Sequence, residues 1–205
     1  VNEIYTGTIA PFDSAAYTFA APINLSANGT YTLKTWTSYP GDQNIYSDSA
    51  SVVLTVAVIT SPVVETMENF SLCNTSSDCG ATVCLLGNGW VNEDSPADDI
   101  DFRTNEGPTP TSSSGPGTDH TTASSTGNYI YLEASNNCFF QQANLLSPCI
   151  DLSDADFGQM TFWYHMYGSS MGVLHVDVFD GNTWLNDVIP AVSGNQGNQW
   201  LQGSI

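Results

Sequence analysis

Apolar and polar positions alternate with a period of two along much of this chain, which is the pattern of half-buried β-strands. In TYTLKTWTS (30–38), Tyr31 and Leu33 fall on the opposite side from Lys34. The segment SASVVLTVAV (49–58) has the composition of a strand. Further strands are expected at 15–25, 128–135, 159–168, 171–180 and 182–190.

The clearest pattern lies in GVLHVDVF (172–179). One side of that segment is wholly aliphatic, with Leu174, Val176 and Val178, and we expect it to face the core. Gly, Pro, Asn, Ser and Thr interrupt the chain every few residues, and short apolar runs between turn residues are typical of sandwiches and barrels. The sequence therefore predicts an all-β protein.

The 205 residues allow one or two domains. Residues 1–57 hold four or five short expected strands. The pattern GTIAPFDSAAYTFAAPINLSANGTYTLKTWTSYPGDQN (7–44) resembles the CARDB-like, fibronectin-like modules of secreted bacterial proteins, so we interpret 1–57 as a partial Ig-like β-sandwich. A short Pro-containing linker, VITSPVV (58–64), follows. Composition changes after it, because Trp becomes frequent and all the cysteines appear, so 65–205 is expected to be a second domain.

The net charge of the chain favours some classes of binding partner and disfavours others. Asp and Glu total 21 against two basic residues, Lys34 and Arg103, for a net charge of −19. Nucleic-acid affinity depends on basic side chains that neutralise phosphates, so no nucleic-acid partner is expected. Clustered carboxylates suit hard cations such as calcium, or they simply keep an exposed protein soluble. No apolar run approaches the length of about 18 residues needed to span a bilayer, and no membrane insertion is expected.

Five cysteines, at 73, 79, 84, 138 and 149, indicate disulfides and hence an oxidising compartment. Their spacing favours a Cys138–Cys149 bridge and a second bridge between two of Cys73, Cys79 and Cys84. Spacing alone leaves open which thiol of those three is unpaired.

Several stretches in order resemble the MAM domain, an extracellular adhesion module. They are a Glu-rich first strand ETMENFSLC (65–73), GNGWVNEDSPADDIDFRT (87–104), GPTPTSSSGPGTDHTT (107–122), GNYIYLEAS (127–135), ANLLSPCIDL (143–152) and FWYHMYGSSMGVLHVDV (162–178). The cysteine cluster CNTSSDCGATVC and the phrase LLGNGWVN resemble a bacterial branch found in secreted proteins of Bacteroidetes-type bacteria. Phe102 stands where relatives usually have Trp, and the domain is expected to be C-terminally incomplete.

This resemblance implies a jelly-roll-like β-sandwich, an adhesive or receptor-ectodomain role, and a bound cation. Relatives imply calcium ligands at the positions of Glu68 and Asp99, with Asp101 next, since Asp99 and Asp101 point to the same side of a strand. The alternative is that these acids are solvated loop residues.

Other candidate groups have simpler structural interpretations. Asp119 beside His120 invites an acid–base role, but no nucleophile motif accompanies the pair, so we expect Asp119 to accept backbone N–H bonds and fix its loop. His165 and His175 are expected to be semi-buried strand residues rather than a metal pair. The aromatic run FWYHMY (162–167) either packs under the 106–127 loop or forms a platform for sugars, and packing is favoured.

Two short motifs, Asp13-Ser14-Ala15 and Asp48-Ser49-Ala50, match the pattern that Bacteroidetes-type bacteria O-glycosylate, so Ser14 and Ser49 are candidate glycosylation sites.

Together these features predict a non-catalytic adhesion or recognition module of a large, modular, secreted or cell-surface bacterial protein. Its partner would be a protein or glycan on a cell surface or in the matrix, with self-association as a further option. A carbohydrate-binding module and an accessory region of a secreted peptidase are the alternatives.

Overall fold

The computed structural model describes residues 2–10, 13–21, 23, 29–39, 49–56, 58–75, 79, 84–93, 97–135, 138–153 and 156–205. Within these ranges the regular elements are all β-strands and none is a helix, which confirms the all-β prediction. The chain divides into two compact units, Val1–Val58 and Ile59–Ile205. The segment 58–64, expected to be a linker, begins with a strand, β3 (Val58–Thr60).

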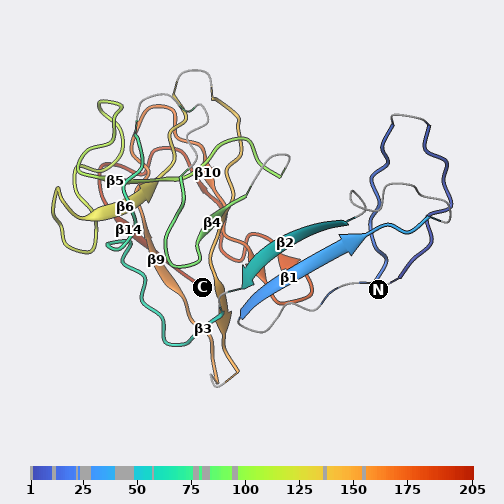
Figure 1. The fold of residues 1–205 in the computed structure, drawn as a ribbon. Helices are drawn as coiled ribbons and strands as arrows, with labels where there is room; N and C mark the ends of the chain where they lie inside the picture. The colour runs from blue at the N-terminus through green and yellow to red at the C-terminus, as the bar shows by residue number, and fades with distance from the viewer. Residues whose placement is uncertain are drawn as a thin grey trace. The chain divides into compact units, whose positions relative to one another are not determined.

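A single hairpin organises the described part of the first unit. Strands β1 (Gly29–Trp36) and β2 (Ser49–Val56) pair antiparallel along their whole length and appear as adjacent blue and teal arrows in Figure 1. Tyr31 and Leu33 lie on the less exposed side, as the alternation predicts. Residues 15–21, part of the strand expected at 15–25, form no strand. Within the described part of residues 1–57, β1 and β2 are the two strands that form. The Ig-like interpretation of 1–57 therefore stays a prediction.

The second unit consists of short strand pairs, several of which join segments far apart in the chain. Besides β3, its strands are β4 (Val91–Asn92), β5 (Arg103–Glu106), β6 (Asn128–Tyr131), β7 (Leu145–Leu146), β8 (Cys149–Asp151), β9 (Thr161–Tyr164), β10 (Val173–Leu174), β11 (Val178–Phe179), β12 (Trp184–Leu185), β13 (Val192–Ser193) and β14 (Leu201–Ser204). The pairs are β3 with β8, β4 with β7, β5 with β6, β9 with β14, β10 with β13 and β11 with β12. In Figure 1, β5 lies beside β6 and β9 beside β14.

Among the described strand pairs, β5–β6 alone carries fully buried side chains. Tyr129 and Tyr131 of β6 are 4% and 8% exposed, and they lie on one face because strand side chains alternate. The Tyr129 hydroxyl donates to the Gly107 carbonyl at 2.6 Å and accepts a bond from the Asn105 amide at 2.8 Å. Arg103 is also buried, at 2% exposure. This core therefore contains hydrogen-bonded polar groups as well as rings.

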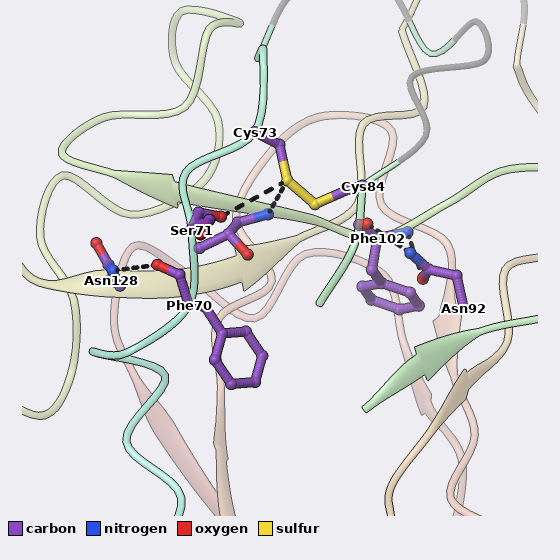
Figure 2. Close-up of a disulfide and its surroundings, with 8 residues drawn as sticks. Phe70, Ser71, Cys73, Cys84, Asn92, Phe102 and Asn128 are labelled. Carbon is purple, nitrogen blue, oxygen red and sulfur yellow. Dashed lines mark hydrogen bonds between the residues drawn. A yellow bond between two sulfur atoms is a disulfide. The ribbon is translucent and has the colours of Figure 1, made fainter. Parts of the chain in front are cut away.

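The Glu-rich segment 65–73 is not a strand, contrary to the sequence prediction. It forms a turn in which Met67 has a φ of +65° and the Phe70 N–H donates to the Met67 carbonyl. The turn places the Phe70 ring in the core, at 4% exposure, and the Asn128 side-chain amide donates to the Phe70 carbonyl (Figure 2). This segment is therefore anchored by the buried Phe70 ring and not by pairing with a neighbouring strand.

Two disulfides bridge the second unit. Cys73 bonds Cys84, with Cα atoms 5.8 Å apart, and Figure 2 shows this bridge beside the backbone of β5. The Thr104 N–H donates to the Cys73 sulfur at 3.4 Å. The second disulfide joins Cys79 to Cys138, which are 59 residues apart in sequence.

The predicted bridge between two of the three clustered cysteines is confirmed as Cys73–Cys84. The predicted Cys138–Cys149 bridge is wrong, and no thiol of the cluster is unpaired, because Cys79 bonds Cys138. Cys149 is exposed and free. It begins β8, which pairs with β3, while Cys138 is bonded to Cys79. Proximity in sequence does not decide disulfide pairing, because the fold brings distant segments together and holds near ones apart.

Candidate functional site

Two of the acidic residues predicted to bind calcium, Glu68 and Asp99, have different hydrogen-bond partners. Glu68 is half-buried, and its Oε2 accepts the backbone N–H of Asn128 at 3.3 Å. Asp99 is exposed, and its Oδ2 accepts the N–H of Gln142 at 3.0 Å. Asp101 is half-buried. The carboxylates of Glu68 and Asp99 thus each accept a backbone N–H from a different segment.

One atom in this set fits a cation ligand. The Glu68 Oε1 is buried and has no hydrogen-bond partner, which is an unfavourable state for a carboxylate oxygen unless a cation or water satisfies it. In the described part of the chain, however, no three His, Cys, Asp or Glu side chains gather closely enough to hold a metal ion. Calcium also accepts backbone carbonyl ligands, so calcium binding at Glu68 stays a prediction.

This prediction has a direct test. If a calcium ion binds Glu68 in the native state only, added calcium will raise the melting temperature and excess chelator will lower it, because a ligand specific to the native state stabilises it. The E68Q variant should lose this response, while E106Q, which changes an exposed residue of β5, should keep it. A melting curve that is identical with calcium and with chelator would exclude the site.

Asp119 is a structural anchor, as predicted. It is 2% exposed, and its carboxylate accepts the Thr122 N–H at 2.6 Å, the Thr122 hydroxyl at 2.7 Å and the Ser124 N–H at 2.9 Å. Burial alone would raise the pKa of Asp119, but these hydrogen bonds outweigh it and hold the pKa below the ordinary value. An ionised carboxylate saturated with donors is suited to fixing a loop and is a poor general base.

His120 packs against an aromatic side chain. Its ring stacks on Trp163 of β9, with centroids 3.7 Å apart and planes at 17°. The neighbouring Trp200 indole donates to the Thr118 carbonyl at 3.0 Å. These contacts join the 106–127 loop to the β9–β14 pair, so the predicted packing of the aromatic run under this loop is confirmed at Trp163.

The two histidines of the segments 159–168 and 171–180 have different surroundings. His165 is half-buried and its Nε2 lies 3.1 Å from the Asn198 side-chain oxygen, and burial lowers the pKa of His165 below its ordinary value. His175 is exposed and its Nδ1 lies 2.7 Å from Asp187 Oδ1. The expectation of semi-buried strand histidines holds for the burial of His165 alone, because His175 is exposed and both residues follow directly after the ends of β9 and β10.

The two candidate glycosylation serines are accessible. Ser14 and Ser49 are both exposed, and the Ser14 N–H donates to the Asp13 carboxylate at 2.8 Å. Asp48, which belongs to the second motif, lies outside the described residues. Exposure is necessary for modification but does not establish it, so glycosylation stays a prediction.

Sequence reasoning did not single out one surface feature, an exposed aromatic pair on the β11–β12 hairpin. Phe179 and Trp184 are 50% and 52% exposed, and their ring centroids are 5.2 Å apart. The alternation in 172–179 predicted that Phe179 faces away from the core, but it could not place Trp184 beside it. The register of the hairpin supplies that neighbour.

Comparisons with known proteins agree with this architecture. A family model for the MAM domain, meprin/A5/mu, matches residues 74–205. That range covers more than half of the chain, and the chain therefore belongs to the MAM domain family. MAM domains have the jelly-roll β-sandwich fold, in accord with the predicted fold class.

Curated relatives share the same region. The chain is 36% identical to Neuropilin-1a of Danio rerio over 121 residues, which is 57% of this chain and 12% of that protein. It is 39% identical to human MAM domain-containing protein 2 over 100 residues, or 48% of this chain and 14% of that protein. The chain thus spans roughly a tenth of the length of these relatives. A comparison with solved structures found no match.

No described helix has the length and hydrophobicity that a membrane span requires.

Proposed function

We propose that this chain is a non-catalytic, extracellular recognition module that binds a protein on a cell surface or in the matrix. The observation that carries the proposal is the MAM family match over residues 74–205. The family implies adhesion or a receptor ectodomain, and two disulfides in the second unit fit an oxidising compartment. The same reasoning favours a secreted or cell-surface location.

The geometry of the histidines supports a role without catalysis. A nucleophilic site needs a base within hydrogen-bond reach of a hydroxyl or thiol. Each described hydrogen bond or ring contact of His120, His165 and His175 leads instead to an aromatic ring, an asparagine or an aspartate. The Asp119 carboxylate is used within its own loop. Within the described part of the chain, these contacts thus pair none of the three histidines with a hydroxyl or thiol.

The finer proposal is that the module belongs to a large, modular bacterial protein. Its support is the likeness of CNTSSDCGATVC and LLGNGWVN to the bacterial branch of the family. The curated relatives named above are vertebrate proteins and do not bear on this point. Sequencing the complete gene would decide it, and a zinc-protease motif elsewhere in the same gene would favour the peptidase-accessory alternative.

Adhesion can be tested with the full chain coupled to beads. We expect the beads to bind protein-coated surfaces, to lose that binding after protease treatment of the surface, and to keep it after glycosidase treatment. Self-association would appear as bead clustering in the absence of any surface. Specific binding to one oligosaccharide on a glycan array, with no protein binding, would favour the carbohydrate-binding alternative and contradict the proposal.

A further inference from the structure

One face of the second unit combines exposed rings and carboxylates. Along residues 173–179 the exposure alternates, with Val173, His175, Asp177 and Phe179 exposed and the three residues between them half-buried. Val173 lies in β10 and Phe179 in β11, and the alternating exposure continues through the segment between these strands, so the four exposed residues share the outward side. An acid and an aromatic ring therefore stand two residues apart on one solvent-facing surface.

The hairpin adds a second ring to this side. Phe179 of β11 pairs directly with Trp184 of β12, and their ring planes meet at 44°. The turn between them is fixed by Asp180, whose Oδ1 accepts the N–H groups of Asn182 and Thr183 at 2.8 Å each. An exposed aromatic pair on a tied turn is preorganised, so little side-chain entropy remains to be lost when a partner binds.

Asp177 and Asp187 are joined by a backbone-to-side-chain hydrogen bond, and the Asp187 carboxylate also contacts His175. The Asp187 N–H donates to Asp177 Oδ1 at 2.8 Å, and Asp187 Oδ1 lies 2.7 Å from His175 Nδ1. These contacts use one oxygen of each carboxylate, and the second oxygen has no partner among the described residues. We name this surface, formed by His175, Asp177, Phe179, Trp184 and Asp187, the Trp184 face.

We propose that the Trp184 face docks an arginine- or lysine-bearing segment of a partner protein. This inference rests on the proposed recognition function and names the chemistry of the partner. Charge complementarity carries it: a cation over the face of Trp or Phe is attracted by the ring, and a neighbouring carboxylate accepts its N–H groups. The net charge of −19 would also attract a basic segment over longer distances.

The same features disfavour other occupants. An anionic glycan or nucleic acid would be repelled by Asp177 and Asp187. A neutral glycan could stack on the rings but would gain no ion pair from the carboxylates. Arginine has an advantage over lysine here, because its planar guanidinium both stacks on aromatic rings and binds carboxylates with two parallel hydrogen bonds.

The test uses the full chain and a fluorescent, end-blocked peptide of alternating arginine and glycine, with binding followed by fluorescence anisotropy at low salt. We expect D177N/D187N and W184A each to weaken binding by roughly tenfold. The control E106Q/D156N changes the net charge equally at two other exposed acids, and W36A removes an exposed tryptophan of the first unit. Both controls should change the Kd by less than about twofold. A lysine–glycine peptide should bind more weakly than the arginine peptide.

Variants that keep the wild-type melting temperature allow each outcome of these experiments to be interpreted. Equal weakening in the matched controls would show bulk charge attraction and overturn the inference. Binding of a neutral oligosaccharide that is lost in W184A, without peptide binding, would also overturn it and identify a sugar platform. If the bead assay shows protein adhesion that D177N/D187N leaves intact, the inference fails and the proposed function stands. If wild-type beads bind no protein at all, the proposed function itself fails.

Discussion

The double variant C79S/C138S is expected to lose about 4 kcal/mol of unfolding free energy, because this disulfide closes a loop of 59 residues. Cross-linking residues so far apart removes many conformations from the unfolded chain, and the effect grows slowly with loop length. The double variant avoids leaving a free thiol that could pair with Cys149. Urea unfolding followed by tryptophan fluorescence, without reductant, measures the change.

Two control variants locate the effect. C149S should leave stability unchanged, since Cys149 is free and exposed. C73S/C84S removes a bridge with a sequence separation of 11 and should cost about 3 kcal/mol, less than the longer loop. A large loss of stability in C149S, with none in C79S, would restore the Cys138–Cys149 pairing expected from spacing and contradict the structure.

The second large effect is expected at Asp119. Replacing it with alanine removes the acceptor of three hydrogen bonds and leaves the N–H groups of Thr122 and Ser124 without their carboxylate partner, which should lower the unfolding free energy by about 2–4 kcal/mol. Asp180 offers a matched control, because it accepts two backbone N–H groups in a similar turn but is exposed. D180A should be much less harmful, since water replaces the carboxylate there.

The contribution of Asp119 to the unfolding free energy should depend on pH, in a direction set by its lowered pKa. The folded-state pKa of Asp119 is lowered from an ordinary value of 3.8, so its contribution is present above that value and is lost as the pH falls through the folded pKa. The stability difference between the wild type and D119A should therefore be full at neutral pH and shrink in strong acid. Urea unfolding at both pH values measures it, and a difference that grows on acidification would contradict the assignment.

Gly127 provides an independent check on the same loop. A Cβ atom there would meet the Asp119 carboxylate and the Thr122 hydroxyl, so G127A should disturb the same hydrogen bonds without changing charge. Gly172, with open space around its Cβ position, is the matched control, and G172A should have little effect. If G127A were as stable as the wild type, the close packing of this loop would be disproved.

The sequence by itself determined the properties that depend on local order. The period of two in 172–179 placed Leu174, Val176 and Val178 on the less exposed side, and the structure agrees. The chain of motifs from 65 to 178 indicated the MAM family, and a family model matches 74–205. Side-chain alternation and local turn chemistry are local constraints, and a linear pattern records them directly.

Tertiary structure decided what depends on contacts between distant segments. It paired Cys79 with Cys138, made a turn of the expected strand 65–73, and set Trp184 beside Phe179. Glu68 illustrates the reason: its partner, Asn128, lies 60 residues away, and the position of that partner follows from how the β5–β6 pair buries Phe70, Tyr129 and Tyr131. Burial of apolar surface selects among many pairings that spacing leaves equal, so these features are fixed only once the whole core has formed.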